Sequence, residues 1–190
     1  RLDYDGPADT VYLGAWPRGS FDRHGGFDET LVRNQDDEHN LRIVLGGGKL
    51  WQSSRIRSRY RPRARLGQVF RQYLQYGYWK PFVMKKHGQA ASLRHVVPAA
   101  FVIALGVFAL VALLGGGAGP LLGLVALYTL AVAALSAGVL LAAPLPRPVA
   151  LRVPAVIVTY HLAYGIGSIA GAFDALRDGR GRERFTGLTR

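Results

Sequence analysis

The chain has 190 residues, 49% of them hydrophobic, and its 24 lysines and arginines against 12 acids give a formal net charge of +12. This length suits one domain, or a small domain joined to a membrane segment. The lack of cysteine excludes disulfides and thiolate metal sites.

Charge and hydrophobicity divide the chain into two unlike parts. Residues 1–95 contain 17 basic and 9 acidic side chains, whereas residues 96–190 contain 7 and 3. The only methionine is Met84, so we expect the sequence as given to begin within a domain. The pattern predicts a polar, basic domain followed by an apolar membrane segment.

The first predicted elements are short. Thr10-Val11-Tyr12-Leu13 is rich in strand-forming residues and is followed by Gly14, which predicts a strand. Gly25-Gly26 precedes Phe27 and indicates a turn that buries the aromatic ring.

Three consecutive acids, Asp36-Asp37-Glu38, begin the next predicted element. Leu41, Val44 and Leu45 follow at helical spacing, and three glycines come after them. Acids in the first turn, where the backbone amides stabilise carboxylates, and glycine at the end predict a short helix over 36–45. The acids can serve as a plain helix cap or can contribute a catalytic carboxylate.

An arginine at every second position marks residues 55–65. The segment that precedes these arginines, Lys49-Leu50-Trp51-Gln52, predicts another strand. In an extended chain the six arginines would share one face and could bind a diphosphate or an anionic lipid surface. The same charge would attract nucleic acid, and a basic edge beside a bilayer needs no specific ligand.

Apolar and aromatic residues recur at helical spacing from Arg65 to His87, with an interruption expected at Pro81. A basic, aromatic-rich amphipathic helix suits a membrane interface. The alternative is an ordinary surface helix packed on the domain.

Three long apolar segments follow, at 96–114, 121–143 and 153–173. Each has about the 20 residues that a helix needs to cross a bilayer, so we expect about three transmembrane helices. The basic residues before the first segment predict a multi-pass protein of the cytoplasmic (inner) membrane with the basic domain in the cytoplasm. A crossing third segment would place the basic tail, 174–190, outside, and a re-entrant or interfacial segment would keep it inside.

Four ordered motifs resemble the acceptor half of family 2 inverting glycosyltransferases with the GT-A fold. They are Gly25-Gly26-Phe27-Asp28-Glu29, Gln35-Asp36-Asp37-Glu38, Gly47-Gly48-Lys49-Leu50-Trp51 and the segment from Arg71 to Lys80. Within the family, the sequence looks most like membrane-associated enzymes of succinoglycan-type exopolysaccharide synthesis. The resemblance implies an α/β fold, a partial Rossmann-like GT-A domain over 1–63, with an interfacial helix region over 64–95.

The resemblance also implies site residues. Asp36 aligns with the general base, which takes a proton from the acceptor hydroxyl, although Gln35 stands where glutamate is commoner and Asp37 remains an alternative. Supporting or acceptor-binding roles fall on Gln35, Asp37, Glu38, Asp28, Glu29 and Trp79. Trp79 can offer an aromatic face on which an acceptor sugar stacks, or it can be a buried core residue.

The family's Gln-x-x-Arg-Trp signature is only partly present. Gln75 and Trp79 match it, but Tyr78 replaces the arginine that helps to hold the donor diphosphate in processive members. The departure favours transfer of one sugar per acceptor. The donor-diphosphate residues would be Gln75, Lys80, Arg71 and Arg63, with Arg61 as a further possible cation.

The partners implied are a nucleotide-sugar donor such as UDP-glucose, a polyprenyl-diphosphate-linked saccharide acceptor and membrane lipids, and no nucleic acid. Mg²⁺ or Mn²⁺ is expected in the intact enzyme with its ligands outside this chain, because Asp3-Tyr4-Asp5 follows no apolar strand. The alternative function is a non-catalytic membrane adaptor whose basic domain docks lipid or protein partners.

Overall fold

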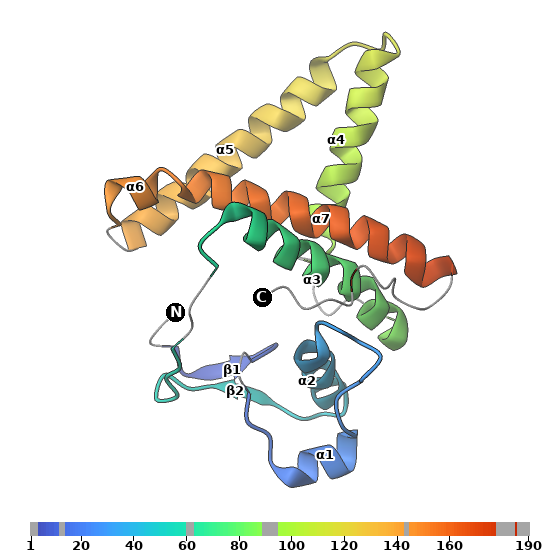
Figure 1. Ribbon diagram of the computed structural model, residues 1–190, viewed down its shortest axis with the longest axis vertical. Helices are drawn as coiled ribbons and strands as arrows, with labels where there is room; N and C mark the ends of the chain where they lie inside the picture. Colours follow the sequence, from blue (N-terminus) through green and yellow to red (C-terminus); the bar gives the residue numbers. More distant parts are fainter. Residues whose placement is uncertain are drawn as a thin grey trace.

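The computed structural model describes residues 4–11, 14–59, 63–88, 95–142, 145–177 and Phe185. Helices α3 and α7 lie side by side across the middle, with β1, β2, α1 and α2 on one side and α4 and α5 on the other (Figure 1). We call β1, α1, α2 and β2 the N-terminal lobe, and α4 with α5 the apolar hairpin. In chain order the elements are β1 (Gly6–Ala8), α1 (Arg18–His24), α2 (Gln35–Leu45), β2 (Leu50–Gln52), α3 (Leu66–His87), α4 (Val97–Leu113), α5 (Gly119–Ala142), α6 (Arg147–Ala150) and α7 (Val153–Arg177).

The sheet has two antiparallel strands, with Pro7 of β1 opposite Trp51 of β2. The strand predicted at 49–52 is confirmed. The strand predicted at 10–13 is misplaced, because the pairing segment is Gly6–Ala8, and Tyr12 and Leu13 lie outside the described residues. Thr10 instead accepts a hydrogen bond from the Asn40 side chain at 3.0 Å. The described residues therefore do not show a Rossmann-like GT-A sheet.

Helix α2 confirms the helix predicted over 36–45, with one more residue at its start. Asn34 precedes it in the left-handed conformation (φ 64°), which asparagine tolerates better than most residues. The Gly46 amide closes the helix by donating to the Arg42 carbonyl at 2.9 Å. Ile43 is buried, whereas Val44 and Leu45, two of the three residues whose spacing predicted the apolar face, are exposed, so the inward face differs from the expected one.

Helix α3 runs through Pro81 without the interruption expected there. Proline removes one backbone hydrogen bond, and the extensive packing of α3 along α7 compensates for it. Three glycines make this packing possible. A Cβ atom at Gly77, Gly167 or Gly171 would overlap a backbone carbonyl oxygen of the opposite helix. The two backbones are therefore in direct contact.

The core lies where this helix pair meets the N-terminal lobe. Tyr78 is completely buried, donates a hydrogen bond to Asp174 at 2.8 Å and stacks on Phe185 with ring centroids 3.9 Å apart. Leu31, which precedes α2, packs against the same cluster. The full cluster of buried residues is Leu31, Tyr78, Trp79, Phe82, Val83, Ala175 and Phe185.

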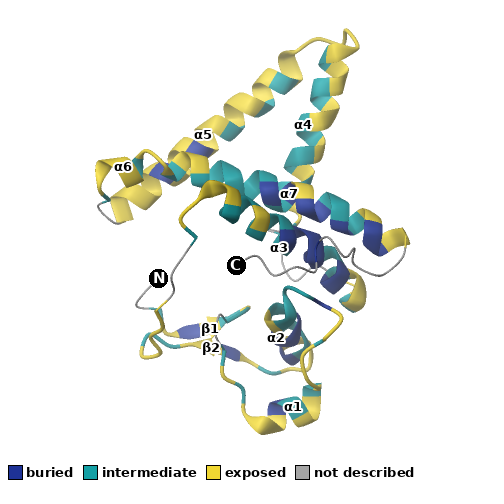
Figure 2. Cartoon of the chain, in the orientation of Figure 1, coloured by how far each residue is buried: buried dark blue, intermediate teal, exposed yellow. Residues whose placement is uncertain are grey.

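The apolar hairpin has almost no protein packing. No residue of α4 is buried, and in α5 only Val132 and Ser136 are buried, so Figure 2 colours most of both helices as exposed or intermediate. Many of the exposed side chains are large and apolar, such as Leu113 and Leu141. Two helical segments, Gly119–Ala142 and Arg147–Arg177, are long and apolar enough to cross a membrane. Helix α4, at 17 residues, falls short of that length. The structure thus supports two of the three predicted spans on length and composition.

Candidate functional site

The three consecutive acids at the start of α2 occupy three different environments. Successive helical residues point about 100° apart, so neighbouring side chains lie on different faces. Asp36 is exposed, and its Oδ1 accepts a hydrogen bond from the Asp37 amide at 2.9 Å. Asp37 forms an ion pair with Lys80 of α3. Glu38 is 0% exposed. Of these acids, Asp36 has the carboxylate most open to a ligand.

Glu38 is the centre of a network that we call the Glu38 cluster: Glu38, Asp28, Arg42, Lys86 and His87. Its Oε1 lies 2.9 Å from both Lys86 Nζ and His87 Nε2, and its Oε2 lies 2.9 Å from Arg42 Nη2. Lys86 also pairs with Asp28 at 2.6 Å. The cluster therefore links α2 and the Asp28 turn to the C-terminal end of α3.

The cations of this cluster keep its two acids ionised. Burial by itself would raise the pKa of Glu38, but the hydrogen bonds from Lys86, Arg42 and His87 outweigh it and lower the pKa. Burial likewise opposes ionisation of Asp28, and the bonds from Lys86 and Thr30 lower its pKa to about 2. Glu38 and Asp28 are thus structural anions, while the neighbouring Glu29 is exposed in the turn.

An aromatic group packs behind the acids. His39 stacks on Phe21 with centroids 5.0 Å apart and meets Trp16 and Phe27 edge-on. The His39 ring is fully buried, and burial followed by the charge of Arg42 lowers its pKa, so it is neutral. Phe27 contacts this group but stays 42% exposed, so the expectation that the Gly25-Gly26 turn buries it is wrong.

The residues expected to hold a donor diphosphate lie along α3 and just before it, and they differ in availability. Gln75 is buried, with its Oε1 accepting from Arg33 Nε at 3.2 Å. Lys80 is also buried, with its ammonium group on Asp37. Arg71 is exposed one turn before Gln75, and Arg63 is half-buried ahead of the helix.

Arg33 is a candidate that the sequence reasoning missed. It lies two residues before α2, contacts Gln75 and sits 5.9 Å from the centroid of the Tyr76 ring. Gln35 lies nearby as the first residue of α2, with its amide donating to the Leu31 carbonyl. Arg33 and Gln75 are 42 positions apart in the sequence and meet only in the folded chain, so no local sequence pattern reveals Arg33 as a candidate.

Trp79 does not offer a face to a sugar. It is 3% exposed, it lies within the core cluster, and its indole N–H donates to the Phe185 carbonyl at 3.2 Å. Tyr78 and Phe82 pack against the ring. Of the two roles that the sequence leaves open, the structure favours packing over an acceptor platform, because the face of α3 that holds Trp79 meets α7 and Phe185.

Comparison with known proteins gives one partial match. Over 81 residues the chain is 33% identical to the succinoglycan biosynthesis protein ExoA of Rhizobium meliloti (strain 1021). This chain is similar to part of ExoA. The aligned part is 43% of this chain and 24% of ExoA, so the chain spans about a quarter of that protein. No family model matches the chain, and no solved structure matches it. The similarity to ExoA supports a distant relationship.

The described residues contain no group of three or more histidines, aspartates and glutamates that could hold a metal ion. Asp5 accepts hydrogen bonds from Trp51 at 2.6 Å and Ser53 at 2.9 Å, and Asp3 lies outside the described residues. A divalent cation thus has no fitting ligand set in the part of the chain that the structure describes.

The arginine-rich segment is only partly described. The described residues 53–59 form neither helix nor strand; Arg55, Arg57 and Arg59 are exposed, and Arg61 lies outside the described residues. Its role at a phosphate or lipid surface stays a prediction.

Proposed function

We propose that this chain is the acceptor-side part of a membrane-associated inverting glycosyltransferase of family 2. In this proposal the enzyme moves a hexose, with UDP-glucose as the expected donor, to a polyprenyl-diphosphate-linked saccharide during exopolysaccharide synthesis. The similarity to ExoA, a succinoglycan biosynthesis protein, supports the pathway class. The two helical segments with the length and composition of membrane spans support action at a membrane, where a lipid-linked acceptor resides.

The observation that best supports the chemistry is that the three acids have different environments. Asp37 and Glu38 are engaged by cations, whereas Asp36 faces solvent at the helix N-terminus. A general base needs a carboxylate that the acceptor hydroxyl can reach, and Asp36 is exposed. This favours Asp36 over Asp37 as the base.

The proposed reaction needs one proton transfer. The acceptor hydroxyl oxygen attacks the anomeric carbon while the bond from that carbon to the donor diphosphate breaks, and the Asp36 carboxylate takes the hydroxyl proton. The nucleoside diphosphate leaves with the bonding electron pair, and attack from the opposite face inverts the anomeric configuration. A divalent cation, held outside the described residues, would supply charge stabilisation to the leaving diphosphate when bound.

Cations on this chain would assist at the diphosphate. Arg33 contacts Gln75, and the exposed Arg71 lies one helical turn before Gln75 on α3. Guanidinium groups suit diphosphate oxygens because they donate two parallel hydrogen bonds. Lys80, held by Asp37, would act by positioning α3 against α2 and not by binding the donor.

The test is the substitution Asp36→Asn in the full-length gene product. General bases contribute roughly 100-fold or more, so we expect turnover to fall at least about 100-fold while donor affinity barely changes. Transfer of labelled hexose to a lipid-linked saccharide measures turnover, and Asp22→Asn, an exposed acid on α1, is the matched control. Turnover within tenfold of the parent protein would refute the assignment of Asp36.

A further inference from the structure

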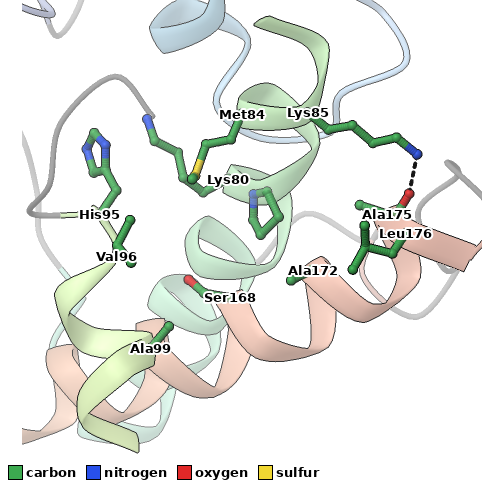
Figure 3. A pocket seen from close by; sticks show the side chains of 11 residues that line it. Lys80, Met84, Lys85, His95, Val96, Ala99, Ser168, Ala172, Ala175 and Leu176 are labelled. Atoms are coloured by element: carbon green, nitrogen blue, oxygen red, sulfur yellow. Dashed lines mark hydrogen bonds between the residues drawn. The ribbon is translucent and has the colours of Figure 1, made fainter. Parts of the chain in front are cut away.

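A cavity of about 270 Å³ lies between α3, the start of α4 and the C-terminal half of α7 (Figure 3). Its wall is mostly apolar, with Pro81 and Met84 from α3, Val96 and Ala99 from the start of α4, and Ala172 from α7. The cavity is therefore built where the amphipathic helix pair meets the apolar hairpin.

The ionisable side chains that line this cavity are all basic. Lys80, Lys85 and His95 contribute to its lining, and no acid is among the described residues that line it. Lys85 reaches the Ala175 carbonyl and Lys80 reaches Asp37, so their ammonium groups lie on opposite sides of the apolar space, with Lys80 on the side of His95 (Figure 3). A ligand with an apolar chain and an anionic head matches this arrangement.

Ser168 adds a second sign of a ligand. Its side chain projects toward the cavity from α7, it is 7% exposed, and its hydroxyl has no hydrogen-bond partner among the described residues. A buried polar atom without a partner is costly, so native proteins rarely keep one without a ligand or water to satisfy it. A ligand that brings an oxygen atom into the cavity mouth would satisfy the hydroxyl.

One ion pair links the cavity to the start of α2. Lys80 lines it and pairs with Asp37, the residue next to Asp36. A lipid whose chain enters the cavity and whose diphosphate lies at Lys80 and His95 would present its attached sugar toward the start of α2. The volume is near the lower limit of ligand pockets, roughly 300–1,000 Å³, so it suits a short length of chain and not a whole lipid.

We propose that this cavity holds the first isoprenoid units of the polyprenyl diphosphate that bears the acceptor saccharide. The proposal rests on the proposed function for the identity of the lipid and adds the place where the lipid binds. The branched, unsaturated chain would fill the space between Met84, Ala99 and Ala172, and the diphosphate would meet Lys80 and His95 at the edge.

The experiment uses the 190-residue chain in nanodiscs of phosphatidylcholine and a farnesyl diphosphate analogue with a diazirine on its chain. After irradiation, mass spectrometry should find the label on peptides of α3, α4 and α7. Unlabelled undecaprenyl diphosphate should compete, and phosphatidylglycerol at the same concentration should not. Equal competition by phosphatidylglycerol would overturn the proposal in favour of ordinary bilayer lipid.

Filling the cavity should abolish the labelling. We expect Ala172→Phe to reduce it at least tenfold, whereas Ala134→Phe, the same change at an exposed position of α5, should leave it unaltered. Ala99→Phe fills the space from the opposite wall and should act like Ala172→Phe if the latter fails to fold. Labelling that persists in the folded filled variants would overturn the proposal.

The design separates this inference from the proposed function. Asp36→Asn should leave labelling unchanged, because Asp36 does not line the cavity. Labelling at the cavity without hexose transfer by the full-length protein would reject the proposed function and keep the binding site. Hexose transfer to a polyprenyl-linked acceptor without labelling would reject only the binding site.

Discussion

Glu38→Gln should destabilise the N-terminal lobe. The side chain is completely buried, and its two oxygens accept from Lys86, His87 and Arg42 at 2.9 Å each. The substitution keeps the shape but removes the charge, and it places an NH₂ group against donors on at least one side. The lost interactions are charge-assisted hydrogen bonds, which are the stronger kind.

The expected loss of stability depends on which interactions Lys86 and Arg42 retain in the Glu38→Gln variant. Breaking a buried ion pair costs about 3–5 kcal/mol when the remaining charge has no other partner. Here Lys86 retains Asp28, and Arg42 retains the backbone carbonyls of His24 and Gly26. We therefore expect a loss of about 2–3 kcal/mol, which is a large share of the roughly 5–15 kcal/mol that stabilises most domains.

Urea unfolding of the chain in nanodiscs, followed by tryptophan fluorescence, measures the change. Glu29→Gln is the matched control, because Glu29 is exposed. The difference between Glu38 and Gln should be full above pH 5 or so and should shrink as the pH falls toward the lowered pKa of Glu38, where the parent carboxyl also becomes neutral. A loss below about 0.5 kcal/mol, the range of ordinary surface changes, would refute the role of the Glu38 cluster.

Two further predictions concern the helix pair. Gly171→Ala should lower the stability of the α3–α7 packing by about 1–3 kcal/mol, because its Cβ would overlap the Tyr78 carbonyl. The control is Gly123→Ala on α5, whose Cβ meets no atom within 4 Å. Equal thermal unfolding of the two variants would contradict the close approach of α3 and α7. A cysteine added after Arg190 should resist an impermeant thiol reagent on intact cells and react after permeabilisation. Phe185 packs on Tyr78 beside the N-terminal lobe, and the five residues that follow span at most about 18 Å, less than the roughly 30 Å of a bilayer core. Although Arg147–Arg177 has the length and composition of a membrane span, this position of Phe185 favours a re-entrant or interfacial segment, and labelling of intact cells would instead support a crossing.

The sequence alone determined the features that depend on neighbours along the chain. Helix α2 was predicted from its acidic start and glycine end, β2 from Leu50-Trp51-Gln52, and the apolar helices from their composition. Local preference placed the first strand wrongly at Thr10–Leu13, because which segment forms a strand depends on which one finds a partner, and Gly6–Ala8 pairs with β2.

Tertiary structure decided what each site residue does. Asp36, Asp37 and Glu38 are alike in sequence, and only their faces on α2, together with Lys80 and Lys86 from α3, separate an exposed acid from two bound ones. Trp79 matches a motif, yet the packing of α7 and Phe185 buries it. Arg33 and Gln75 meet across 42 positions. Sequence patterns encode the spacing of residues along one helix, whereas burial and ion pairing are set by whichever distant segment packs against it.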